Sequence, residues 1–310
     1  MPATTIHQCP RCELRFANRS ELEHHVRTDH LPVAGDDPPI PPPTGGVILV
    51  PVDPAAGPTP AVALAAALAR QTGDAVEVVT VPPVGLPVRP DLAGSAQEAQ
   101  AAGAPRVHTR VLAPTGGVAR AIVDRARRPD VRLVCLAARD RSPVVQLLGG
   151  SVSASVVRSS PVPVLIAGPA VRGAGEPLGR IVACLDGSDL AERTLPVAFG
   201  LARRLRARLV LVQAVPSRGP APGGRDEGAY LRRLADRLPY PARSEVIHGD
   251  PPATAIATYA GQGGGTLLVM GTHGGSGLRN AVLGSVARDV ARTAACPVLV
   301  VPAGAAVVGL

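Results

Sequence analysis

The sequence predicts an α/β protein with two tandem doubly wound parallel-sheet domains behind a small N-terminal module. Short apolar runs alternate with helical segments, the second half repeats the first, and a cysteine- and histidine-containing cluster precedes both. The 310 residues suit about two domains of ordinary size. Hydrophobic residues make up 46% but aromatic residues only 2%, so the cores must consist of Val, Leu, Ile and Ala.

The first half alternates apolar runs with Ala- and Leu-rich segments. The runs are short and apolar, which is typical of buried strands. The first helical segment begins with a proline, as helices often do. We expect strands at residues 47–52, 75–81, 106–113, 131–137 and 163–167, and helices at 58–70, 91–104, 118–127 and 151–159. Strands that alternate with helices predict a parallel sheet.

The second half repeats this order. We expect strands at 180–185, 208–215, 243–248, 267–270 and from 297 onward, and helices at 191–206, 228–238, 252–260 and 286–295. Gly284 follows Gly150, and Pro297 follows Pro163, at the same offset of 134 residues. A repeat of this length indicates two copies of one domain. We place the domains at 46–169 and 180–303, with a linker at 170–179.

A glycine-rich stretch follows the apolar run 267–270. It has the pattern Gly271-x2-Gly274-x9-Gly284-Ser285 and leads into a helix. Glycine lets the backbone approach an anion closely, and free amides at a helix N-terminus favour negative charge. A glycine cluster by itself also occurs in ordinary turns.

The spacing resembles the phosphate and ribose loop of the ATP-binding universal stress proteins, and the similarity extends over residues 178–303. The resemblance implies a Rossmann-like fold, with Asp186 near the ribose and a metal such as Mg²⁺, and the Val215 backbone at the adenine. It assigns the phosphates and ribose to Gly271, Gly274, Gly284, Ser285 and Val286. Within Asp-Gly-Ser-Asp, Asp186 also fits a turn or a helix cap.

The first copy, residues 46–169, resembles the same family more weakly. Ala137 stands where the second copy has Gly271, and Asp140 stands where it has Gly274. A Cβ narrows the approach to the backbone, and a carboxylate repels phosphate at close range. Gly150 and Ser151 alone retain the anion site. We therefore expect ATP in the second copy and hardly any in the first.

The N-terminal cluster resembles a two-Cys, two-His zinc finger of the ββα type over residues 1–31. Its spacing is Cys-x2-Cys-x3-Phe-x5-Leu-x2-His-x4-His. We expect Zn²⁺ to be bound tetrahedrally by Cys9, Cys12, His25 and His30. Phe16 and Leu22 supply a minimal core. Metal binding would provide the folding energy of so short a segment.

The partner of the finger stays open between a protein and a nucleic acid. A single finger reads only about 3 base pairs, which is weak by itself. Residues 32–45 are rich in proline and predict a stiff, extended linker, with a ligand for proline-binding modules as the alternative.

Composition gives further expectations. The net charge is +8 and all 32 basic residues are arginines, which fits an anionic partner or simply a biased coding composition. Five cysteines, an odd number, do not indicate a disulfide framework. The sequence has no apolar N-terminal signal and no uncharged run of about 18 residues that would span a membrane. We expect a cytoplasmic protein without a membrane partner.

The leading hypothesis is an ATP-binding stress-response regulator and not a dedicated enzyme, since the sequence has no P-loop motif. A weak ATP hydrolase or nucleotidyl-transfer enzyme is the second hypothesis, and a zinc-dependent adaptor with scaffold repeats is the third. His273 more readily shapes the loop than acts as a base. Proline-led last strands at Pro163 and Pro297 predict an internal pseudo-dimer, and a further homodimer stays open.

Overall fold

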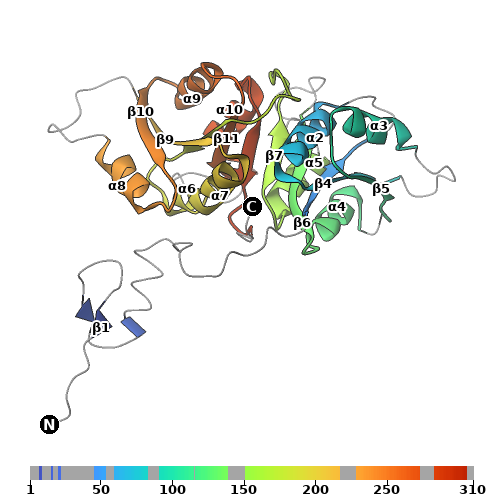
Figure 1. Cartoon of the computed structure of the whole chain (residues 1–310), viewed down its shortest axis with the longest axis horizontal. Coiled ribbons are helices and arrows are strands. Elements are labelled where there is room, and N and C mark those ends of the chain that lie inside the picture. The colour runs from blue at the N-terminus through green and yellow to red at the C-terminus, as the bar shows by residue number, and fades with distance from the viewer. Residues whose placement is uncertain are drawn as a thin grey trace, which may run out of the picture.

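One continuous sheet forms the centre of the molecule (Figure 1). The computed structural model describes residues 7–8, 15–16, 20–21, 45–53, 59–82, 91–114, 116–138, 151–216, 228–272 and 283–305. In this part of the chain ten strands join in the order β10-β9-β8-β11-β12-β7-β6-β3-β4-β5. The predicted α/β architecture with tandem repeats is confirmed.

The two halves contribute matching elements. The first comprises β3 (Val47–Pro51), α2 (Pro60–Thr72), β4 (Ala75–Thr80), α3 (Ala93–Ala101), β5 (Val107–Val111), α4 (Val118–Ala126), β6 (Val131–Ala137), α5 (Ser151–Ser159) and β7 (Val164–Ala167). The second comprises β8 (Arg180–Cys184), α6 (Asp189–Glu192), α7 (Leu195–Leu205), β9 (Arg208–Val215), α8 (Ala229–Arg237), β10 (Ala242–His248), α9 (Pro252–Gly261), β11 (Thr266–Gly271), α10 (Ser285–Thr293) and β12 (Val298–Val301). Among the described residues, no helix is long and apolar enough to cross a membrane.

Local sequence explains the boundaries of α2. Pro60 begins the helix, where a missing N–H costs nothing. Gly73 ends it with a left-handed φ of 76°, and its N–H donates to the Ala69 carbonyl. The strand β4 that comes next is buried along its whole length, as expected for a strand covered by helices on both faces.

The single helix expected over 191–206 is wrong. The structure has a short helix α6 and then α7, which begins at Leu195. Pro196 has no N–H to give to the carbonyl one turn earlier, and its ring crowds that carbonyl. The Thr194 N–H and hydroxyl both donate to the Ala191 carbonyl, at 3.0 and 2.6 Å, which closes the last turn before the break.

The last strands of the two repeats join the halves. β12 and β7 pair antiparallel, with Leu299 opposite Leu165, whereas the other neighbours in the described sheet are parallel. The expected internal pseudo-dimer is therefore present within one chain. Each repeat covers the edge that the other would otherwise expose.

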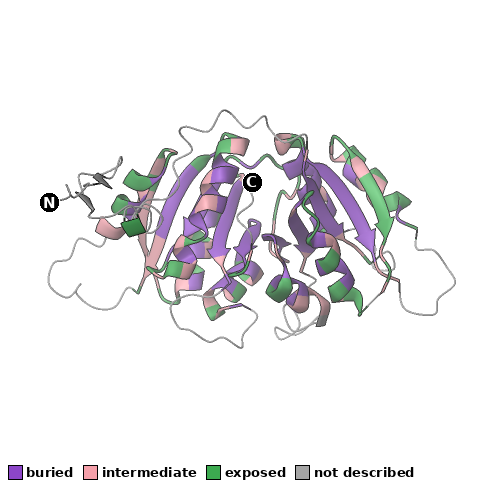
Figure 2. Cartoon of the chain, turned by 90° about the horizontal axis from the view of Figure 1, so that it is seen from below, coloured by how far each residue is buried: buried purple, intermediate pink, exposed green. Residues whose placement is uncertain are grey.

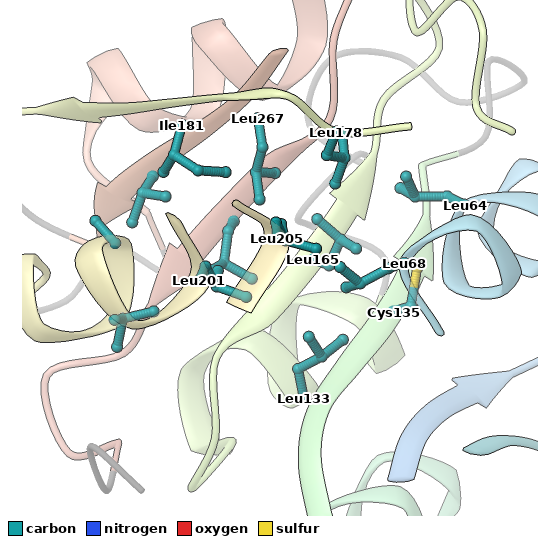
Figure 3. Close-up of a cluster of buried hydrophobic side chains, with 14 of the residues drawn as sticks. Leu64, Leu68, Leu133, Cys135, Leu165, Leu178, Ile181, Leu201, Leu205 and Leu267 are labelled. Atoms are coloured by element: carbon teal, nitrogen blue, oxygen red, sulfur yellow. The ribbon is translucent and has the colours of Figure 1, made fainter. Parts of the chain in front are cut away.

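Both faces of the sheet bury cores that run through the two repeats. One core lies under α2, α3, α7 and α8, and the other under α4, α5, α9 and α10. In the first core Leu64 and Leu68 of α2 gather near Leu165 and near Leu201 and Leu205 of α7 (Figure 3). The inner strands of the sheet are accordingly buried, whereas β5 and β10 at its two ends are more exposed (Figure 2). The two repeats thus share their hydrophobic stabilisation.

Polar contacts also cross between the repeats. The Asp74 carboxylate is 2% exposed and accepts from Arg204 of α7 at 3.0 Å and from the Gly46 N–H at 2.9 Å. The Gln71 amide bonds both main-chain groups of Leu178, donating to its carbonyl at 3.1 Å and accepting from its N–H at 2.7 Å. Together these contacts fix the orientation of the second repeat on the first.

The structure describes only parts of the N-terminal segment. β1 (His7–Gln8) and β2 (Arg15–Phe16) pair antiparallel, and residues 20–21 are helical. The expected zinc ligands Cys9, Cys12, His25 and His30 lie outside the described residues.

The junction of the repeats predicts a specific cross-link. Val164 and Val300 lie opposite each other, so their Cβ atoms are close enough for a disulfide when both are changed to cysteine. We expect efficient oxidation to an intramolecular bond, measured by mass spectrometry of the proteolysed, non-reduced chain. Val164→Cys with Leu299→Cys is the matched control, because these side chains point to opposite faces. Equal cross-linking of both pairs would contradict the strand register in which Val164 lies opposite Val300.

The Asp74–Arg204 contact predicts a clear energetic effect. Arg204→Ala should lower the free energy of unfolding by about 1–3 kcal/mol, because it leaves a buried carboxylate short of a donor. Arg120→Ala, which removes an exposed pair with Asp124, should give no measurable change. Denaturant titration checks both. Equal changes in the free energy of unfolding in the two variants would show that Arg204 does not stabilise the buried Asp74 carboxylate.

Candidate functional site

A pocket of about 260 Å³ lies at the carboxyl ends of the strands of the second repeat. Its lining residues are Cys184, Leu185, Asp186, Ala191, Val212, Ala214, Pro252, Ile256, Met270, Gly271, Gly284, Ser285, Val286 and Ala287. β8 has β9 on one side and β11 on the other, so the strand order reverses at this position. Crevices at such switch points are the usual ligand sites of open parallel sheets.

Asp186 lies at the exposed end of β8 and shapes the turn after it. One carboxylate oxygen accepts from the Ser188 N–H at 3.0 Å and from the Ser188 hydroxyl at 2.6 Å. Gly187 between them has a φ of 82°. The Ser188 hydroxyl also accepts from Ala191, which caps α6. Asp186 is thus a turn residue and a pocket residue at once.

Negative charge collects beside this turn. Burial raises the pKa of the Tyr230 hydroxyl, and the carboxylates of Glu192 and Asp186 raise it further. The phenol of α8 therefore stays neutral next to two carboxylates at neutral pH. A cation that accompanies an anionic ligand would be stabilised at this end of the pocket.

A short hydrogen bond closes the glycine-rich loop. The Gly284 N–H donates to the Thr272 carbonyl at 2.7 Å, and the Thr272 N–H donates to the Val301 carbonyl at 3.3 Å. The end of β11 and the start of α10 are thereby fixed to each other. Gly284 has a φ of −58°, which any residue can adopt, and its amide is occupied. Gly284 therefore does not itself donate to an anion.

The amides available to an anion are those of the first turn of α10. The first N–H groups of a helix have no partner within it, and here they belong to Ser285, Val286 and Ala287, which line the pocket. The intrahelical bonds begin with the Arg288 N–H, which donates to the Gly284 carbonyl at 3.0 Å. The positive end of the helix dipole therefore faces the pocket.

The opposite part of the pocket is apolar. Val212 and Ala214 of β9 face Ile256 of α9 and Met270 of β11 across it. Sequence reasoning missed all four, although the alternation along β9 and the helical spacing from Pro252 to Ile256 place them on the pocket face. This part suits a flat, weakly polar group.

One expected residue is not part of the pocket lining. Val215 is outside the lining set, and its carbonyl already accepts from the Gly249 N–H at 3.1 Å. Ala214, one residue earlier, lines the pocket in its place. Gly274 and His273 lie outside the described residues. Five of the seven expected residues are brought together, namely Asp186, Gly271, Gly284, Ser285 and Val286.

The described lining offers little acid–base chemistry. Its ionisable side chains are those of Asp186 and Cys184. Burial raises the pKa of the Cys184 thiol to about 12, with a smaller contribution from Cys296, so the thiol stays protonated at neutral pH. Among the described residues no group of acidic, cysteine or histidine side chains could hold a metal ion.

The first repeat has the same strand end and the same hydrogen bond after it, followed by a different loop sequence. Ala137 ends β6 as Gly271 ends β11, and the Ala138 N–H donates to the Ala167 carbonyl at 2.9 Å, as Thr272 does to Val301. Asp140 and Gly150 lie outside the described residues.

Comparison with known proteins agrees with this geometry. The model of the universal stress protein family matches residues 46–168 and 177–302, which are the two repeats. A universal stress protein of Mycobacterium tuberculosis is 32% identical over 187 residues, covering 55% of this chain and 58% of the relative. One of Methanocaldococcus jannaschii is 33% identical over 138 residues, covering 39% and 81%.

A solved structure shows the same fold. The universal stress protein from Archaeoglobus fulgidus superposes with a TM-score of 0.62 at 20% identity, covering 83% of this chain and 98% of that one. The chain thus spans little more than half of its mycobacterial relative but nearly all of this solved structure. Because the family model covers both repeats, the chain belongs to the universal stress protein family.

Proposed function

We propose that the second repeat binds ATP and that the protein acts as a nucleotide-dependent regulator of a stress response. The observation that carries the proposal is the pocket at the switch point. It contains both an apolar slot, formed by Val212, Ala214, Ile256 and Met270, and the N-terminus of α10. The slot of Val212, Ala214 and Ile256 fits a purine, and the amides of α10 fit phosphate oxygens.

The polar end of the pocket supports a role for Asp186. Its carboxylate lies at the mouth, where it would meet a ribose hydroxyl or a Mg²⁺ ion held by the phosphates. Gly274 belongs to the same proposal, as the position at which the loop must stay small and uncharged. In the first repeat, Asp140 at the equivalent position opposes phosphate binding.

Gly274→Asp should weaken ATP binding by about tenfold or more, for which a loss of ~1.4 kcal/mol suffices. The change adds a Cβ and a negative charge at the position where the proposal places the phosphates. Isothermal calorimetry with ATP, ADP, AMP and cyclic AMP measures the affinity, and melting curves test the fold. We expect about one ATP per wild-type chain, in keeping with a single intact loop.

Matched serine variants test which repeat binds. Ser285→Ala removes a hydroxyl at the N-terminus of α10 and should weaken ATP, whereas Ser151→Ala makes the same change in the first repeat and should not. Equal affinities in wild type and folded Gly274→Asp would place the nucleotide elsewhere. Two sites per wild-type chain would show that the first repeat also binds.

We also propose that the N-terminal segment is a zinc-stabilised interaction module. The spacing of Cys9, Cys12, His25 and His30 supports it, and so does the pairing of Gln8 with Arg15, which brackets both cysteines. The module would bind a protein or a nucleic acid, with residues 32–45 as the spacer.

The wild-type chain should contain about one Zn²⁺ by elemental analysis, since four ligands close one tetrahedral site. Cys9→Ser should abolish it, because the loss of a thiolate opens that site. His108→Ala, which changes a histidine exposed on β5, is the control and should retain the metal. A wild-type zinc content near zero at neutral pH would disprove the module.

A further inference from the structure

The outer strand β5 ends the ten-stranded sheet, at the opposite extreme from β10. Among the described strands it pairs with β4 alone, and its residues from His108 to Val111 are exposed, in contrast to the buried strands beside it (Figure 2). The nucleotide pocket lies among the strands of the other repeat, so a function of β5 would be independent of that pocket.

The free edge of β5 presents main-chain groups in a defined pattern. The Arg106 carbonyl accepts from β4 at 2.9 Å and the Leu112 N–H donates to β4 at 2.8 Å. Because main-chain groups alternate in direction along a strand, those of Val107, Thr109 and Val111 point to the outer edge. Such a row is a template for an added strand.

A groove of about 750 Å³ runs along one side of β5, and its lining is partly apolar and partly polar. It is lined by Thr109, Arg110 and Val111 of β5, by Leu92, Ala93 and Ala96 at α3, and by Asp91 before that helix. The large hydrophobic side chains that are exposed in the described part of the chain are Val111 at 43% and Val118 at 37%. Both lie at this end of the sheet.

The other side of β5 is strongly basic. A groove of about 560 Å³ between β5 and α4 is lined by Arg110, Arg125 and Arg128 together with Asp124 and Asp130. Arg120 and Arg127 bond Asp124 from the same helix region. Five arginines therefore face the carboxylates of Asp124, Asp130 and the buried Glu77.

Glu77 fixes the positions of two of these arginines. Its carboxylate is 2% exposed and contacts Arg110 and Arg125, each at 2.5 Å. Arg125 is nearly buried and also pairs with Asp130, whereas the Arg110 side chain is 58% exposed. The Arg110 Nε donates to Glu77, and the same side chain lines the groove between β5 and α4. The excess positive charge thus lies next to the strand edge.

We propose that β5 is a docking strand for an extended segment of a partner protein in which acidic and apolar side chains alternate. The segment adds an eleventh strand through the main-chain groups of Val107, Thr109 and Val111. Its side chains point alternately to the two faces, so that acidic ones meet Arg110 and Arg128 and apolar ones enter the groove beside α3. A second copy of β5 is disfavoured, since antiparallel pairing about Thr109 would place the arginine-bearing faces of the two copies side by side without an acidic partner.

The test uses the full-length chain and a labelled, capped peptide in which valine and glutamate alternate, with binding measured by fluorescence anisotropy. Thr109→Pro removes one outward N–H, a change that edge strands tolerate, and should weaken the peptide by about tenfold or more. Ser244→Pro is the matched control on β10. The Gly249 N–H bonds Val215, so the Ser244 N–H also points outward, and this variant should bind like wild type.

Val111→Asp keeps every main-chain group and should also weaken the peptide, because it replaces an apolar contact with a negative charge. A peptide with lysine in place of glutamate should bind at least about tenfold more weakly. The proposal fails if wild type does not bind the valine–glutamate peptide, or if folded Thr109→Pro and Val111→Asp bind it as wild type does. It also fails if the wild-type chain self-associates and Thr109→Pro abolishes that association. A single-stranded oligonucleotide that displaces the peptide equally well from wild type and from Thr109→Pro would instead show that the arginines bind nucleic-acid phosphates.

Discussion

The antiparallel pairing of β7 with β12 is the contact on which the rest of the structure depends. Without it, each repeat would expose a short apolar strand at its edge. With it, two small sheets become one, and the cores on both faces continue across the junction. The pairing also reverses the strand direction, so the carboxyl ends of the two repeats lie at opposite edges of the sheet. The two loops that correspond in sequence therefore cannot cooperate at one site.

Within the second repeat, hydrogen bonds fix the chain segments that line the pocket. The Thr272 carbonyl holds the Gly284 amide, which sets where α10 begins and aims its free amides. The turn at Asp186 is held in a similar way by Ser188. Both contacts come from chain segments that directly succeed a strand, so the pocket is built on the rigid sheet. A preformed site of this kind loses little conformational freedom when a ligand binds.

The two repeats differ in the contacts of their charged side chains. At the outer end of the first repeat a buried carboxylate, Glu77, is held between Arg110 and Arg125. The matching region of the second repeat instead stacks the Arg180 guanidinium on the Tyr259 ring at 4.4 Å. A buried charge is stable only when it is paired, so the arginines of the first repeat are structural as well as surface features. The fold is duplicated, whereas the surface chemistry is not.

The order of strands and helices, the repeat and the glycine-rich loop could be predicted from sequence alone, because apolar periodicity and glycine spacing are local properties of the chain. Tertiary structure decided the rest. The helix predicted over 191–206 is broken before Pro196, where the Thr194 N–H and hydroxyl both bond the Ala191 carbonyl. That Ala214 and not Val215 lines the pocket depends on strand register, since a shift of one residue turns a side chain to the other face. The exposed edge of β5 and its arginines likewise became visible only once the order of the strands was known.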